Sequence, residues 1–440
     1  MELVSALGFE LVQILSVAVI FPIVAPALGP GEYGRYTTLY VIAGLAMTWV
    51  SAAGGAAMVQ LIIQRSRTVE SVLLFARRQI YFAAIPFALL GSIASVALFG
   101  REILLPAVLV FGGDLVLGGI ASVRINAIFA TVGVTAASRI KMISPVLRMV
   151  GVTVLAATGE ISIVSLVAIN SGATLVVLMI AMKFSRDLGR YDDDAAEATS
   201  GRELLRLTGT YAATISANTT QDEGEKIVLV SYRPAAEVGE YQAAYRLISL
   251  ALVPLEALNT VATRWALFPS DEPNAQLRRA TRLSLVVGAY GVLVAIAAVI
   301  ASPLIALILG EEFAQTTTMF LWLSGFPLFR ALSDIPVIGL IGLNCNVERM
   351  VLGLSGAVAA VVLYLAMVPA LGWQGAVIGT YISEMLTLLG GWILLIDRQR
   401  RVDRRRSVEG PDVPLPPPTV ESRADSGGGY EPTTPPDTTL

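Results

Sequence analysis

The 440-residue chain contains no histidine and a single cysteine, Cys345. The absence of histidine excludes serine–histidine catalytic triads, histidine-ligated metal sites and histidine proton relays. One cysteine excludes an intramolecular disulfide and a cysteine cluster for metal. Charged residues make up only 15% of the chain, whereas 55% of it is hydrophobic. Soluble proteins carry about 25% charged residues, so the composition excludes an ordinary soluble enzyme. We expect no metal site and no cofactor.

Long hydrophobic runs dominate the sequence instead. Most are close to the ~20 residues that a helix needs to cross a ~30 Å hydrocarbon core. Only a helix satisfies all its backbone hydrogen bonds within one run at that depth, so each run predicts a spanning helix. The runs are 6–28, 36–63, 80–99, 103–121, 140–158, 161–182, 208–232, 238–262, 283–309, 315–343, 350–370 and 373–396. The sequence therefore predicts an all-α integral membrane protein with twelve transmembrane helices.

Lysine and arginine are unevenly distributed among the loops between these runs. With the N-terminus placed inside, the inside loops and the segment after the last run hold 23 of the 31 basic residues, and the outside loops hold 3. Cytoplasmic loops of membrane proteins carry an excess of basic residues. The pattern predicts a multi-pass protein of the inner (plasma) membrane with its N- and C-termini in the cytoplasm.

Residues 397–440 differ in composition from the rest of the chain. Six arginines between Arg398 and Arg406 precede a stretch rich in Pro, Gly, Asp and Thr. Such a composition cannot bury an apolar core, so we expect a disordered cytoplasmic tail, first basic and then proline-rich. The arginines either hold anionic lipid at the cytoplasmic leaflet or only fix the topology.

Two short patterns occur twice in the chain. Residues 32–36 read E-Y-G-R-Y and residues 237–241 read E-V-G-E-Y, an offset of 205 positions. Residues 99–102 match residues 309–312 at an offset of 210. Both matches lie at equivalent helix junctions, so they favour two six-helix halves, 1–200 and 201–396, inserted in the same orientation. Transporters built from parallel repeats bind their substrate between the halves.

The duplicated glycines and tyrosines also have a local interpretation. Gly34 and Gly239 suit a tight turn between helices, because glycine adopts backbone conformations closed to other residues. Tyr36 and Tyr241 lie near the predicted outer interface, where tyrosine is enriched. We interpret all four as structural residues and not as substrate contacts.

The first copy of the motif resembles the polysaccharide flippases of the multidrug/oligosaccharidyl-lipid/polysaccharide exporter superfamily. That family has L-G-P-x-E-Y-G-x-Y after its first span, and residues 28–36 read L-G-P-G-E-Y-G-R-Y. Its V-G-x-Y-x-x-A-Y pattern resembles residues 238–245, and its L/F-G-x-x-F/Y junction resembles residues 309–313. The resemblance extends over about residues 5–396.

This resemblance implies a MATE-like fold and the translocation of an undecaprenyl-diphosphate-linked oligosaccharide across the bacterial inner membrane. The role would be transport for surface polysaccharide biosynthesis by alternating access, without enzymatic activity. The implied partners are the lipid-linked oligosaccharide, membrane lipids and other polysaccharide-assembly proteins, but no nucleic acid.

Ionisable residues inside the predicted spans indicate the candidate site, because a charge facing lipid at a helix centre costs ~2.5–3.5 kcal/mol. A lipid diphosphate needs cations along its path. The substrate-binding candidates are Arg148, Lys226, Arg246 and Arg330. The candidates for ion coupling or for lining a cavity are Asp114, Asp222, Glu225 and Asp334. Asp222 with Lys226, and Arg330 with Asp334, are i, i+4 pairs, which can instead simply neutralise each other.

Two other functions stay open. A drug/cation antiporter of the same superfamily would carry an acidic coupling site in its N-terminal half, where Glu10 and Asp114 are the deep acids before residue 200. A membrane-embedded polysaccharide polymerase or transferase would need a large external loop for its catalytic residues. Every predicted outside loop is only a few residues long, which disfavours this third function.

Overall fold

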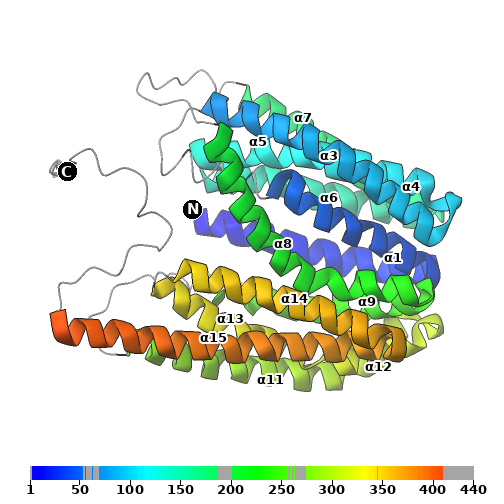
Figure 1. The fold of residues 1–440 in the computed structure, drawn as a ribbon. Helices are drawn as coiled ribbons and strands as arrows, with labels where there is room; N and C mark the ends of the chain where they lie inside the picture. Colours follow the sequence, from blue (N-terminus) through cyan, green and yellow to red (C-terminus); the bar gives the residue numbers. More distant parts are fainter. Residues whose placement is uncertain are drawn as a thin grey trace.

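The computed structural model describes residues 2–52, 55, 62, 69–186, 201–255, 258–259, 262, 274–343 and 345–409. In chain order the elements are α1 (Glu2–Met47), η1 (Thr48–Ala52), α3 (Val69–Phe99), η2 (Arg101–Ile103), α4 (Leu104–Leu109), η3 (Val110–Leu117), α5 (Gly118–Thr131), α6 (Val134–Thr158), α7 (Ile163–Ser185), α8 (Gly201–Tyr232), α9 (Ala235–Ser249), η5 (Leu250–Leu252), α11 (Ala275–Leu309), η6 (Glu311–Phe313), α12 (Ala314–Leu323), α13 (Phe326–Gly342), α14 (Asn346–Leu371) and α15 (Trp373–Glu409). All regular structure in the described ranges is helical (Figure 1).

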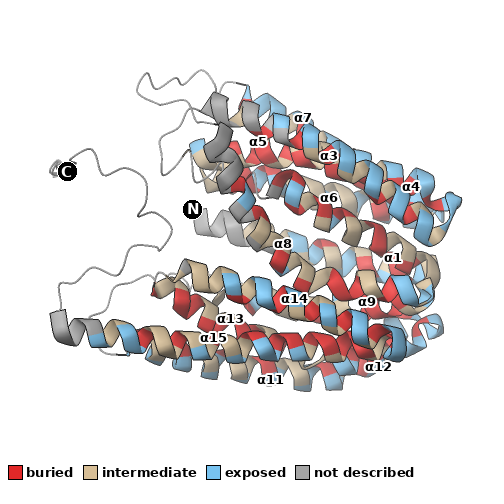
Figure 2. Cartoon of the chain, in the orientation of Figure 1, coloured by how far each residue is buried: buried red, intermediate tan, exposed pale blue. Residues whose placement is uncertain are grey.

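Nine helical stretches among the described residues are long and apolar enough to cross a membrane. Large apolar side chains such as Phe82, Ile300 and Leu307 are exposed on the outside of the bundle. Figure 2 shows exposed residues in pale blue along the outer helices. Such a surface suits contact with lipid. The chain is therefore a multi-pass membrane protein, and the predicted all-α membrane class is confirmed.

The number of twelve spans stays a prediction. One of the nine stretches, Leu11–Ser51, overlaps two predicted spans, and the helical path breaks between them at Gly29, where φ is 68°. Neither α8 nor α9 is among the nine, although both coincide with predicted spans. The central part of α8 carries a run of polar residues from Asn218 to Lys226, which lowers its hydropathy.

The helices form two groups that lie side by side (Figure 1). The first contains α1 and α3 to α7, with α1 packed on α6; the second contains α8 to α15, with α8 packed on α14 and α15. This arrangement agrees with two parallel-repeat halves. The predicted boundary at residue 200 adjoins residues 187–200, which lie outside the described part of the chain.

Two equivalent junctions have nearly the same backbone conformation. Gly100 (φ 86°, ψ 180°) follows α3 and begins the short turn η2. Gly310 (φ 82°, ψ 175°) follows α11 and begins the short turn η6. Only glycine adopts this conformation readily. The match supports the equivalence that the sequence predicts for residues 99–102 and 309–312.

The two groups of helices meet where α1 crosses α9. A Cβ atom built on Gly34 would collide with the carbonyl oxygen of Ala235, and one on Gly239 would collide with the carbonyl oxygen of Pro30. Neither glycine has a positive φ, because both lie inside helices. The interpretation of Gly34 and Gly239 as turn residues is therefore wrong: they allow two helix backbones to touch, and Gly29 makes the turn before the second span.

An apolar core surrounds this crossing and joins the two groups. It includes buried Tyr33, Leu229, Val238 and Phe313, which come from both sides of the contact. The end of the molecule that holds residues 30–34 and 235–239 is therefore firmly packed, and we call it the closed end. The topology prediction places it on the outer side of the membrane.

The basic segment after the last predicted span is helical. α15 continues without a break to Glu409, and it projects beyond its neighbours in Figure 1. Arg398 on this extension pairs with Glu348 of α14 at 2.6 Å. The expectation of an irregular tail from residue 397 is therefore wrong for residues 397–409. The proline-rich part, residues 410–440, lies outside the described residues.

Candidate functional site

A cavity of about 910 Å³ lies between the two groups of helices. Its walls come from α1, α5, α6 and α7 on one side and from α8, α9 and α13 on the other. It reaches from Tyr33, beside the closed end, to Phe9 and Lys141 near the opposite end of the bundle. The sequence candidates that line it are Arg148, Asp222, Lys226, Arg246 and Arg330.

In the first group, Arg148 of α6 has a partner on a neighbouring element. Its guanidinium lies 3.5 Å from an oxygen of Asp114 in η3. Thr174 donates a hydrogen bond of 2.7 Å to that same carboxylate oxygen, and Tyr40 donates one of 3.1 Å to the other. Asp114 is thus surrounded by three donors, and Arg148 is only partly neutralised because the ion-pair distance is long.

In the second group, Arg330 of α13 holds two carboxylates from two other helices. It lies 3.0 Å from Asp222 of α8 and 3.0 Å from Glu384 of α15. Glu384 is almost fully buried and also accepts a hydrogen bond from Ser333. Asp334, one turn after Arg330, accepts instead from Asn259 at 2.8 Å. Arg330 therefore joins α8, α13 and α15, and it does not pair with Asp334.

Lys226 also departs from the i, i+4 interpretation. Its ammonium lies 2.6 Å from Glu223 and 3.9 Å from Glu225, while Asp222 contacts it only through its backbone carbonyl. The ammonium sits 3.6 Å from the ring centroid of Tyr245, a favourable cation–π position. Glu225 is 1% exposed, and neither of its oxygens has a hydrogen-bond partner among the described residues. The pairs predicted along single helices are thus replaced by other partners.

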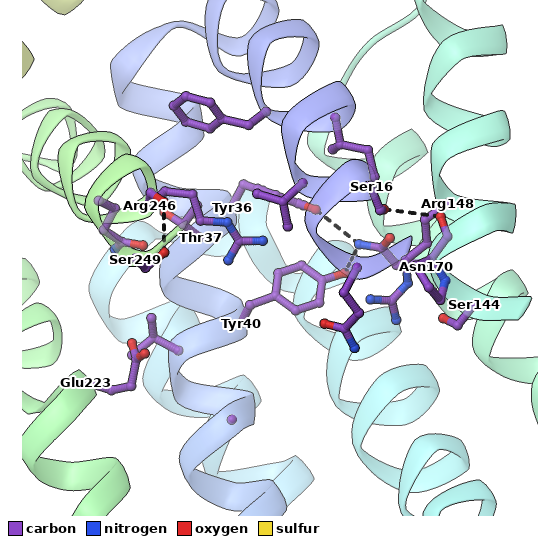
Figure 3. Close-up of a pocket in the computed structure, with 18 of the residues that line it drawn as sticks. Ser16, Tyr36, Thr37, Tyr40, Ser144, Arg148, Asn170, Glu223, Arg246 and Ser249 are labelled. Carbon is purple, nitrogen blue, oxygen red and sulfur yellow. Dashed lines mark hydrogen bonds between the residues drawn. The ribbon is translucent and has the colours of Figure 1, made fainter. Parts of the chain in front are cut away.

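Two cations in the cavity wall lack a carboxylate partner among the described residues. Arg246 of α9 is exposed to the cavity, and Figure 3 shows its guanidinium pointing away from α9 into the open space. Lys141 of α6 is also exposed and contacts the ring of Phe9 at 6.0 Å. In the sequence Lys141 counts among the basic residues of an inside loop, although the predicted span 140–158 already begins one residue before it. Its spacing of seven residues, or two helical turns, before Arg148 was the available signal.

A hydrogen-bonded wall of neutral residues was also missed. Asn170 of α7 donates to the hydroxyls of Tyr36 at 3.1 Å and Tyr40 at 2.6 Å, and the two tyrosine rings pack edge to face at 5.1 Å (Figure 3). All three residues line the cavity. Tyr36 therefore faces the cavity, contrary to its interpretation as a purely structural interface residue. The side chain of Glu10, named for the antiporter alternative, lies outside the described residues.

Comparisons with known proteins identify a family and a fold for this chain. The sequence profile of the family described as "Polysaccharide biosynthesis protein" matches residues 23–324. A search of curated proteins found no match. Solved structures match in fold: an inward-facing multidrug resistance MATE family transporter of the MOP superfamily is 14% identical, with 88% of this chain and 96% of that chain covered and a TM-score of 0.72.

Two further structures share this fold at similarly low identity. The inward closed conformation of the lipid II flippase MurJ is 12% identical, with 91% of each chain covered and a TM-score of 0.68. An outward-facing MATE family transporter of the MOP superfamily is 13% identical, with 89% of this chain and 94% of that chain covered and a TM-score of 0.63. The chain thus shares a transporter fold with structures captured in different conformations.

Proposed function

Because the chain belongs to the polysaccharide biosynthesis protein family, we propose that it flips an undecaprenyl-diphosphate-linked oligosaccharide across the bacterial inner membrane for surface polysaccharide synthesis. The protein acts as a transporter and not as an enzyme in this proposal. The polyprenyl tail stays among membrane lipids while the headgroup crosses through the cavity. Other polysaccharide-assembly proteins would supply the substrate and take up the product.

The observation that carries this proposal is that Arg246, in a cavity between the two halves, has no carboxylate partner among the described residues. A diphosphate needs cations that are free to bind it, and paired cations must first leave their carboxylates. Arg330 and Lys226 each contact two carboxylates, and Arg148 contacts one. Arg246 and Lys141 are therefore the cations with the lowest barrier to binding a headgroup, with Arg148 next. Of the first two, only Arg246 can bind a phosphate through a two-pronged donor. We assign Lys226 and Arg330 mainly to holding α8 in place.

The arrangement of the halves supports alternating access. α1 and α9 are in backbone contact at the closed end, whereas the cavity extends between the halves towards the opposite end. With the predicted topology, this state exposes the cavity to the cytoplasm, where the lipid-linked substrate is made. The structure has a higher TM-score to the inward-facing MATE structure than to the outward-facing one, which supports the assignment of an inward-open state.

The test replaces the free cation and a matched arginine outside the cavity. Arg246→Gln should reduce translocation at least about tenfold, the loss expected from one charge-assisted hydrogen bond. Arg246→Lys should recover part of it, since the charge is kept but the two-pronged donor geometry is lost. Arg101→Gln, at an exposed position in η2, should behave like the wild type.

The assay follows lipid-linked oligosaccharide in membrane vesicles by its accessibility to a glycan-modifying enzyme added on one side. Accumulation on the cytoplasmic leaflet with normal protein levels is the expected result for Arg246→Gln. Normal translocation by this variant would remove the central support of the proposal.

The drug/cation antiporter is the second candidate, favoured by the fit to MATE transporter structures. Asp114 is the described acid that could serve it in the first half, but Arg148, Thr174 and Tyr40 already contact both of its oxygens. If Arg246→Gln leaves glycan export intact while Asp114→Asn abolishes export of a cationic dye, the antiporter assignment replaces the flippase.

A further inference from the structure

The two walls of the cavity differ in chemistry. The second-group wall carries charges on α8, α9 and α13, namely Asp222, Glu223, Lys226, Arg246 and Arg330. Among the described residues, the first-group wall contains no acidic lining residue; apolar side chains and the cations Lys141 and Arg148 lie there beside neutral polar residues such as Tyr36, Tyr40 and Asn170. A diphosphate fits the charged wall. Tyr36, Tyr40 and Asn170, which we call the neutral wall, carry no charge and suit an uncharged polar ligand group.

We propose that Tyr36, Tyr40 and Asn170 form a carbohydrate-binding wall that recognises the first sugar attached to the diphosphate. The inference rests on the proposed function, since it divides that substrate between two parts of one cavity. The diphosphate lies against Arg246, and the adjoining sugar ring lies against the neutral wall. No charge on the sugar is required.

The hydrogen bonds of the wall leave specific groups available to a ligand. The side-chain amide of Asn170 donates its hydrogen bonds to Tyr36 and Tyr40. Its side-chain oxygen accepts none from the described residues and is available to a ligand. Asn170 is only 7% exposed and lines the cavity. The Tyr36 hydroxyl accepts from Asn170, and its own hydrogen has no acceptor in the described part of the chain. One free acceptor and one free donor therefore lie side by side, as the hydroxyls of a sugar require.

The wall is also held in place before any ligand binds. Tyr40 donates to Asp114, which Thr174 and Arg148 hold from the other side. The rings of Tyr36 and Tyr40 pack edge to face, which fixes both on the surface of α1. A preorganised site loses less side-chain entropy on binding than a flexible one. The network gives Asp114 a positioning role, which is an alternative to ion coupling.

The size of the cavity limits how much of the glycan it holds. A volume of about 910 Å³ is near the upper end of the ~300–1,000 Å³ typical of pockets for drug-sized ligands. A diphosphate with one or two sugar rings fits within such a space. The neutral wall is therefore expected to recognise the sugar nearest to the diphosphate, whereas more distant sugars stay in water.

The experiment compares two probes on the full chain in lipid nanodiscs: undecaprenyl diphosphate, and the same lipid carrying one N-acetylhexosamine. The wild type should bind the glycosylated probe about tenfold or more tightly, an advantage worth one to two hydrogen bonds. Tyr36→Phe and Asn170→Ala should remove most of that advantage while the bare lipid still binds. Tyr290→Phe is the matched control, because the Tyr290 hydroxyl bonds the backbone of Ala251 away from the cavity lining.

Each outcome decides a different statement. Loss of the sugar advantage in both wall variants, but not in Tyr290→Phe, supports the wall. An undiminished advantage in Tyr36→Phe and Asn170→Ala overturns it, as does an equal loss of affinity for both probes. If the wild type binds neither probe, the proposed function itself fails, and this result is separate from failure of the wall.

Discussion

The contact between Gly34 and Gly239 predicts that one added methyl group will change the conformational equilibrium. A Cβ on Gly34 would lie 2.9 Å from the Gly239 nitrogen and would collide with the Ala235 carbonyl oxygen. All of these neighbours are backbone atoms, so no side chain can turn aside to make room. Gly34→Ala must therefore separate α1 from α9 at the closed end.

The size of the effect follows from the cost of overpacking. Forcing an extra methyl group into a packed contact costs typically about 1–3 kcal/mol. A state open at this end has already parted the two helices, so it escapes the cost. The equilibrium should move towards that state by about 5- to 150-fold. Gly239→Ala should have the same effect, and the double variant should add less than the sum because one separation relieves both clashes.

Cysteine labelling measures this shift. The single native cysteine, Cys345, is replaced by serine, and Thr37, which lines the cavity just inside the crossing, is replaced by cysteine. A membrane-impermeant maleimide added from the outer side should react faster in Gly34→Ala. Gly31→Ala is the control, because a Cβ there meets nothing within 4 Å. Equal labelling rates in Gly34→Ala and Gly31→Ala would refute the reasoning.

Two further predictions concern the charges that hold α8. Arg330→Gln should destabilise the protein by about 3–5 kcal/mol, because it leaves the buried Glu384 carboxylate without its ion pair. Adding Glu384→Gln should restore much of the loss, which a thermal unfolding midpoint in detergent would show; no recovery would mean that Arg330 acts elsewhere. Lys226→Gln should be rescued by Glu225→Gln, since Glu225 is buried beside it, but not by Asp222→Asn, whose carboxylate belongs to Arg330. Rescue by Asp222→Asn in the same assay would favour the i, i+4 pair instead.

Hydropathy predicts the membrane class of this protein well, because the cost of burying polar backbone in lipid acts on each segment separately. The topology that the loop charges predict stays a prediction. The junctions at Gly100 and Gly310 are likewise a local property: the duplicated motif predicts that they are equivalent, and the two glycines take nearly the same conformation. The helical extension of α15 to Glu409 was missed because a segment rich in charged residues cannot bury an apolar core and was therefore expected to be disordered. Arginine nevertheless has a high helix propensity in water.

Partners across helices are harder to predict from one sequence. Arg148 forms an ion pair with Asp114, which lies 34 positions earlier in the chain. Arg330 forms ion pairs with Asp222 and Glu384 on two other helices. Spacing along one helix cannot reveal these pairs, because helix rotation and packing decide which faces meet. For the same reason Tyr36 was assigned to the membrane interface, whereas the crossing of α1 and α9 directs it into the cavity.

The contact at the closed end is reciprocal in a way that identical subunits would produce. Gly34 approaches Ala235, and Gly239 approaches Pro30. Gly239 is the position equivalent to Gly34, and Ala235 is the position equivalent to Pro30, each at an offset of 205 residues. The two contacts are therefore the same contact made once from each half. In a homodimer this arrangement defines an isologous interface around a two-fold axis. The chain thus carries inside one polypeptide the kind of contact that usually joins two. Because both halves belong to one chain, the sequence of each half can change without the other. The two halves can therefore present different side chains to the cavity, as the charged wall and the neutral wall do.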